Sequence, residues 1–138
     1  MTEDVKILHV EDEAGVREVL DAYLADSDTE MVIETAADGK EGLRLCREKE
    51  FSCIISDYNM PGMDGVEMFK TLRKEGIAVP FIFYTSSKTI RGRIQKNNSN
   101  PPKAILRKGE DGFDDILEAV VDVAKTGDAK TGRQIESR

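Results

Sequence analysis

Residues 54–65 read Ile-Ile-Ser-Asp-Tyr-Asn-Met-Pro-Gly-Met-Asp-Gly, and this stretch decides the fold of the chain. The preceding Cys53 and the two isoleucines form a short, β-branched apolar run, which is typical of a buried strand. Asp57 ends that run, and residues that favour turns follow it directly. A carboxylate at the carboxyl end of a strand lies where α/β sheets bind ligands, but aspartate also begins ordinary turns. Taken alone, the stretch leaves both interpretations open.

Strand and helix patterns alternate on both sides of this stretch. Strands are expected at Val5–Val10, Met31–Ala36, Phe51–Ser56, Val79–Tyr84 and Ala104–Arg107. The first helix is indicated by five apolar residues at intervals of three and four, which predict one buried face: Val16, Val19, Leu20, Tyr23 and Leu24. Five alternations without a repeat predict an α/β fold, a doubly wound five-stranded parallel sheet with helices on both faces.

The segment 88–102 is the irregular part of this pattern. Ile90 and Ile94 have helical spacing, but Gly92 lies between them and an Asn/Pro-rich run follows. Because glycine and proline weaken helices, we expect a short fourth helix followed by an extended loop. Residues 1–125 are expected to form one domain, and residues 126–138 a flexible tail or a truncated linker.

Composition restricts the class of protein. The chain has 138 residues, of which 39% are hydrophobic, a proportion that suits one core. No apolar run is long enough to span a bilayer, and no signal sequence is recognisable, so a cytoplasmic protein is expected. The net charge of −7 argues against direct nucleic-acid binding. Residues 77–108 nevertheless contain seven bases and no acid, which indicates either a solvated surface or a partner surface.

Polar residues follow four of the expected strands. Glu11 and Asp12 follow the first, Asp57 the third, Thr85 the fourth and Lys108 the fifth. If the strand order is 2-1-3-4-5, the first and third strands are neighbours, and three carboxylates converge. Their mutual repulsion favours a bound cation, and all-oxygen ligands favour Mg²⁺.

These motifs resemble those of response-regulator receiver domains, the phospho-acceptor half of two-component signalling pairs, and in particular the single-domain, chemotaxis-regulator-like members. The resemblance spans residues 5–125 and implies the flavodoxin-like sheet order 2-1-3-4-5. It rests on an acid cluster, the sequence following the acceptor aspartate, a hydroxyl residue and a lysine: residues 11–13, 57–65, 85–86 and 108.

The resemblance also implies a role for each site residue. Asp57 would accept a phosphoryl group from a phosphohistidine, in a switch that is not a metabolic enzyme. Lys108 would pair with Asp57 and then with the phosphoryl oxygens, and the hydroxyl of Thr85 would turn toward that group. Mg²⁺ would be held by Asp57 and three other ligands: Glu11, Asp12 and the backbone carbonyl of Asn59.

The chain departs from the family pattern near the lysine. Gly109 follows Lys108 where the family usually has proline, often in a cis peptide, so a trans bond and a reshaped loop are expected. Ile105 occupies the position of a common aromatic switch residue. Two polar residues near the site are expected to have structural roles. His9 lies in an apolar strand and should be packed or hydrogen-bonded there. Asp64 precedes a helix and should cap it.

The implied partners are a sensor histidine kinase or a phosphotransfer protein, and a downstream target protein for which the basic 88–108 face is a candidate docking surface. No membrane or nucleic-acid partner is expected, and the protein would be a monomer or a phosphorylation-dependent dimer. Three alternatives remain: a phosphorylation-independent interaction module, a receiver fragment of a longer regulator or hybrid kinase, and an aspartyl-phosphate phosphatase or phosphotransferase. The last usually has a second acid where this chain has Asn59.

Overall fold

The structure is a computed structural model that describes residues 5–94 and 100–126. Its strands are β1 (Val5–Val10), β2 (Met31–Ala36), β3 (Cys53–Ser56), β4 (Phe81–Thr85) and β5 (Ala104–Arg107). Its helices are α1 (Ala14–Ala25), α2 (Gly39–Glu48), α3 (Gly65–Lys74), α4 (Ile90–Arg93) and α5 (Phe113–Thr126). The alternation agrees with the sequence pattern, and three strands begin and end at the predicted residues.

All strand pairs are parallel, and the sheet order is β2-β1-β3-β4-β5. The central position of β1 and β3 places their carboxyl ends side by side, in the register Val10 opposite Ser56. This order confirms the predicted doubly wound fold. It also brings together residues that follow strands far apart in the sequence.

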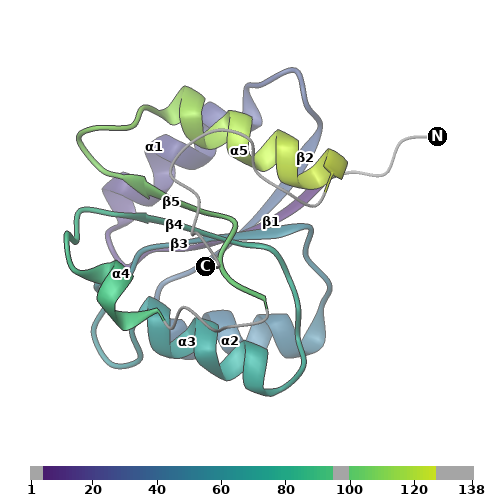
Figure 1. Ribbon diagram of the computed structural model, residues 1–138. Coiled ribbons are helices and arrows are strands. Elements are labelled where there is room, and N and C mark those ends of the chain that lie inside the picture. The colour runs from purple at the N-terminus through teal and green to yellow at the C-terminus, as the bar shows by residue number, and fades with distance from the viewer. Residues whose placement is uncertain (1–4, 95–99, 127–138) are drawn as a thin grey trace.

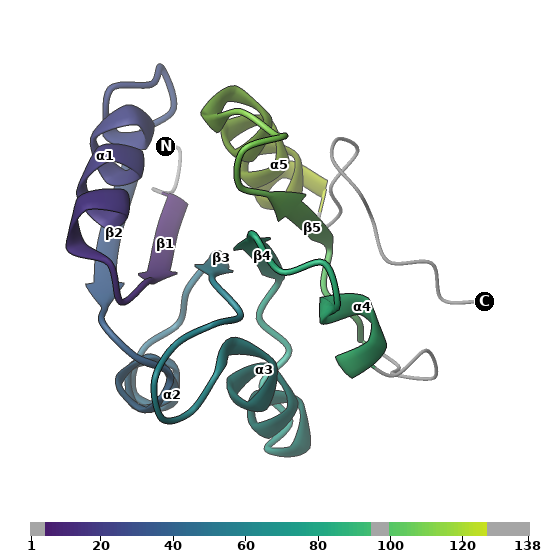
Figure 2. The same ribbon diagram turned by 90° about the vertical axis from the view of Figure 1, so that its left-hand side faces the viewer.

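Helices cover both faces of the sheet (Figures 1 and 2). On one face, α1 and α5 pack against alternate strand residues such as Ile7, Ile55 and Ile82. On the other face, α2, α3 and α4 pack against the strand residues that alternate with the first set, such as Leu8 and Ile54. The strands are therefore apolar on both sides, as expected for a parallel sheet buried between two layers of helices.

Two predicted strands differ in their bounds. β3 begins at Cys53 and not at Phe51, and β4 spans Phe81–Thr85 and not Val79–Tyr84. Pro80 lies outside β4, and its carbonyl accepts a hydrogen bond from Ile54 N–H at 2.8 Å. Proline has no N–H to donate, so the regular ladder begins after it.

The predicted inner face of α1 was partly wrong. Leu20 and Leu24 are buried, but the side chains of Val19 and Tyr23 are 59% and 39% exposed. The buried contact of α1 with the sheet and α5 is narrower than the apolar stripe. Regular spacing predicts the helix correctly but does not define how much of its apolar surface is covered.

The fourth helix is short, as predicted. α4 has four residues, and its first residue, Ile90, is buried against the α2/α3 face of the sheet. The predicted loop after it includes residues 95–99, and the predicted tail includes residues 127–138; both segments lie outside the described residues. Within the described part of the chain, no helix is long and apolar enough to cross a bilayer.

Candidate functional site

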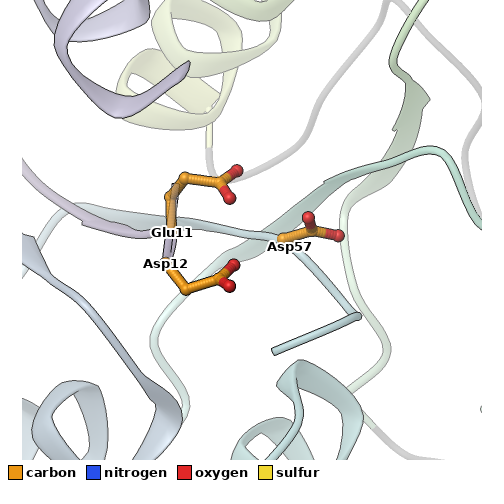
Figure 3. A group of neighbouring side chains, drawn as sticks. All are labelled: Glu11, Asp12 and Asp57. Atoms are coloured by element: carbon orange, nitrogen blue, oxygen red, sulfur yellow. The ribbon is translucent and has the colours of Figure 1, made fainter. Parts of the chain in front are cut away.

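Three carboxylate side chains meet at the carboxyl edge of the sheet (Figure 3). Glu11 and Asp12 follow β1, and Asp57 follows β3; one oxygen of each lies within 4.8 Å of the others. Glu11 and Asp57 are buried, whereas Asp12 is exposed. This convergence, predicted from strand order, forms a cluster of hard oxygen donors of the kind that binds Mg²⁺ in proteins.

The Asp57 side chain is held by the backbone of the loop that follows it. Oδ1 accepts hydrogen bonds from the N–H groups of Tyr58 and Asn59 at 2.6 and 3.2 Å. The loop folds back so closely that a Cβ at Gly65 would lie 2.1 Å from the Asp57 carbonyl oxygen. Only glycine fits there, which explains why a glycine begins α3.

Lys108 supplies the positive charge of the site. Its ammonium nitrogen lies 2.8 Å from Asp57 Oδ2 and 2.9 Å from Glu11 Oε1. Burial acts to lower the pKa of Lys108, but the hydrogen bonds to Asp57 and Glu11 outweigh it, and the pKa is raised. Lys108 therefore stays charged and compensates two of the three carboxylates.

Glu11 is the most buried of the three acids, with 1% of its surface exposed. Burial raises its pKa, and the charge of Asp57 adds to that effect, while Lys108 opposes it. The backbone around Glu11 is fixed, because its N–H donates to the Ala36 carbonyl and its own carbonyl accepts from Arg17 Nη1 at 2.5 Å. The backbone that carries the carboxylate is thus fixed by the sheet and by α1.

Thr85 ends β4 at the same edge of the sheet and is fully buried. Its hydroxyl accepts a hydrogen bond from Ser87 N–H at 3.1 Å, and the Ser87 carbonyl accepts one from Arg107 Nη1 at 3.0 Å. The hydroxyl is therefore engaged with the loop that leads to α4. The turn of this hydroxyl toward a phosphoryl group stays a prediction, as do the acceptor role of Asp57 and the Asn59 carbonyl as a metal ligand.

The loop after Lys108 has the predicted trans peptide bond; cis bonds are absent from the described residues. Gly109 has φ +87°, a conformation that disfavours other residues. Ile105 is buried in the core, on the face that packs against α3. The aromatic ring beside Lys108 belongs to Tyr84, whose ring centroid is 5.7 Å from Lys108 Nζ, and sequence reasoning missed it.

Two neighbouring polar residues have the structural roles predicted for them. His9 Nδ1 lies 2.7 Å from Asp21 Oδ1 of α1. Asp64 forms a reciprocal capping box with Glu67 at the start of α3. Neither belongs to the carboxylate cluster.

The loop between β3 and α3 is also linked to α4. Arg93 Nη1 donates to the hydroxyl of Tyr58 at 2.6 Å, and the guanidinium lies 5.6 Å from the centre of the Tyr58 ring. Tyr58 is the residue next to Asp57, so one side chain links α4 to the loop that begins at Asp57. The sequence offered no spacing signal for this contact.

Comparison with known proteins is consistent with this geometry. The sequence model of the "Response regulator receiver domain" family matches residues 7–121. The response regulator Rre1 of Synechocystis is 33% identical over 123 residues, 88% of this chain and 52% of Rre1. ResD of Bacillus subtilis, a transcriptional regulatory protein, is 34% identical over 94 residues, 68% of this chain and 38% of ResD. The chain thus spans about half or less of these two relatives.

Two solved structures superpose over most of the chain. The chemotaxis protein CheY4 of Vibrio cholerae has a TM-score of 0.72 at 29% identity, covering 88% of this chain and 99% of that one. The response regulator TrrA of Thermotoga maritima, solved with Mg²⁺ and BeF, has a TM-score of 0.74 at 28% identity, covering 86% and 98%.

Proposed function

This chain belongs to the response-regulator receiver family, and we propose that its Asp57 accepts a phosphoryl group from a phosphohistidine of a sensor histidine kinase or phosphotransfer protein. A receiver of this kind is a switch in two-component signalling and not a metabolic enzyme. The observation that carries the assignment is the state of the Asp57 carboxylate: it is buried, two backbone N–H groups hold one oxygen, and Lys108 holds the other.

These contacts suit phosphoryl transfer. A carboxylate oxygen of Asp57 forms the new bond to phosphorus, and the bond between phosphorus and the donor imidazole breaks, its electron pair leaving with the imidazole. Such reactions depend on alignment and on compensation of charge on the phosphoryl oxygens. The backbone N–H groups of Tyr58 and Asn59 orient the carboxylate. Lys108 carries a positive charge at the place where negative charge arrives.

We propose Mg²⁺ as the cofactor, with Glu11, Asp12, Asp57 and the backbone carbonyl of Asn59 as its protein ligands. The donor set fits, because three carboxylate oxygens converge within 4.8 Å at a partly buried edge of the sheet. When bound, Mg²⁺ supplies charge that offsets the phosphoryl oxygens. Glu11 and Asp57 share Lys108 as their counterion in this structure, so Lys108 and a bound cation would compete for these two carboxylates.

Thr85 connects phosphorylation to the surface of the domain. In the proposed phosphorylated state its hydroxyl leaves Ser87 N–H and donates to a phosphoryl oxygen. Ser87 is also bound by Arg107, so the change alters the loop that leads to α4. Lys88 and Arg91 are exposed there, which supports the basic 88–108 face as a docking surface for a downstream protein. Gel filtration before and after phosphorylation would distinguish a constant monomer from a phosphorylation-dependent dimer.

The acceptor is tested by measuring intact mass after incubation with acetyl phosphate, with and without Mg²⁺. We expect a Mg²⁺-dependent phosphoryl adduct on the wild type and none on Asp57→Asn. Asp64→Asn is the matched control, because it changes an acid in the same loop that caps α3, and it should retain the adduct. A folded wild type without an adduct from either acetyl phosphate or a phosphorylated kinase would contradict the proposal and favour a phosphorylation-independent interaction module.

A further inference from the structure

Tyr84 lies beside the charged site although it belongs to the core. It precedes Thr85 in β4, is 7% exposed, and packs on the face of the sheet that α1 and α5 cover. Its ring centroid is 5.7 Å from Lys108 Nζ, within the distance at which a cation and an aromatic ring attract each other. Tyr84 is therefore in contact with the lysine of the site.

Lys108 needs such a restraint. The side chain is long and flexible, and the next residue, Gly109, leaves the backbone permissive. The Lys108 N–H donates to the Thr85 carbonyl at 3.0 Å, which ties the start of the side chain to β4. The far end must still reach two carboxylates at once, and one of them, Asp57, receives the phosphoryl group. When a phosphoryl group joins Asp57, the oxygens around the Lys108 ammonium group change, but its contact with the Tyr84 ring does not depend on them.

We propose that Tyr84 is a positioning residue whose ring holds the ammonium group of Lys108 over the carboxylates of Asp57 and Glu11. The ring is itself held in place: Phe113, the first residue of α5, lies 6.3 Å from it in an edge-on arrangement. Phe113 in turn lies 5.7 Å from the ring of Tyr23 on α1. Both helices on this face thus support the position of the lysine.

The contact is tested directly by NMR on protein with ¹³C-labelled lysine, without any phosphoryl donor. A ring next to an ammonium group shifts the neighbouring methylene protons of that lysine upfield. We expect this shift for Lys108, assigned with Lys108→Arg, in the wild type and in Tyr84→Phe. It should be lost in Tyr84→Leu and kept in Ile82→Val, a change in the same strand and the same cluster. An unchanged Lys108 signal in Tyr84→Leu overturns the proposal.

The functional consequence rests on the proposed phosphorylation of Asp57. With acetyl phosphate and saturating Mg²⁺, we expect Tyr84→Leu to be phosphorylated about fivefold more slowly. Tyr84→Phe keeps the ring and should restore the rate, and Ile82→Val should match the wild type. If Tyr84→Phe is as slow as Tyr84→Leu, or Ile82→Val is equally slow, the ring contact does not position Lys108. If the wild type itself forms no adduct, the proposed function fails, and the NMR comparison still decides the role of Tyr84.

Discussion

Lys108 Nζ donates a hydrogen bond of 2.8 Å to Asp57 Oδ2, although the two residues are 51 positions apart in the sequence. Both side chains are largely buried, at 19% and 8% exposed, so this ion pair is shielded from solvent and from screening by salt. A second hydrogen bond joins the same ammonium to Glu11, 97 positions away. One cation thus compensates two acids that would otherwise repel each other.

Removal of the Lys108 ammonium group should strengthen the binding of Mg²⁺ but slow the phosphorylation of Asp57. Lys108→Ala leaves Asp57 and Glu11 without a counterion, which should lower the free energy of unfolding by about 1–3 kcal/mol in Mg²⁺-free buffer. Mg²⁺ should then bind more tightly than to the wild type, because no lysine competes for the oxygens. Phosphorylation by acetyl phosphate should slow about 10²-fold, because a charge that compensates the phosphoryl oxygens is lost.

Chemical denaturation, Mg²⁺ titration and phosphorylation rates check these three effects. Lys88→Ala, at an exposed position near α4, is the control and should change none of them. Equal or weaker Mg²⁺ binding by Lys108→Ala would count against competition between the lysine and the cation.

Glu11 should make stability depend on pH in the absence of Mg²⁺. Burial raises its pKa above 4.5, so the folded protein binds this proton more tightly than the unfolded chain does. Its contribution to stability is then fully present below pH 4.5 and is lost as the pH rises through the folded pKa. Glu11→Gln should therefore gain stability relative to the wild type as the pH rises above 4.5, the ordinary pKa of this carboxyl.

Denaturation curves at several pH values measure that difference. Glu18→Gln, on the exposed side of α1, is the control. The prediction would be contradicted if the difference in free energy of unfolding between Glu11→Gln and the wild type did not change with pH. Mg²⁺ should stabilise the wild type more than Glu11→Gln.

Gly65 should tolerate no side chain. A Cβ there would lie 2.1 Å from the Asp57 carbonyl oxygen and 3.1 Å from Ser56 Oγ, so the backbone that carries Asp57 must shift. We expect Gly65→Ala to cost about 1–3 kcal/mol of stability and to slow phosphorylation. At Gly15 in α1 a Cβ meets nothing within 4 Å, and Gly15→Ala should stabilise by about 0.5–1 kcal/mol. If Gly65→Ala and Gly15→Ala unfolded at similar temperatures, the close approach of Gly65 to the Asp57 carbonyl would be refuted.

Asp64 should affect α3 and not the cation site. Its carboxylate accepts from Glu67 N–H at 2.8 Å, and the Glu67 carboxylate accepts from Asp64 N–H at 3.0 Å. Asp64→Ala should cost about 1 kcal/mol, the usual value of an N-cap. Asp38→Ala, which removes the cap of α2, should cost a similar amount. Both should bind Mg²⁺ like the wild type, whereas Asp12→Ala should bind it more weakly.

The fold was predictable from sequence because each element has a strong local pattern. The apolar runs and their turn residues indicated β1, β2 and β5 with their bounds, and Asp64 was recognisable as the cap of α3. The bounds of β3 and β4 were less accurate, because the start of a strand depends on hydrogen bonds with its neighbours. The exposure of Val19 and Tyr23 could not be predicted either, because it depends on how α1 lies on the sheet.

The sequence by itself determined which residues stand at the carboxyl ends of the strands: Glu11, Asp12, Asp57, Thr85 and Lys108. That information is local, because each of them follows an apolar run. The tertiary structure alone decided which of them touch. Lys108 binds both Glu11 and Asp57, and the ring of Tyr84 lies beside it. These contacts join residues up to 97 positions apart, and they depend on strand register, side-chain reach and the packing of α5, which no local pattern encodes.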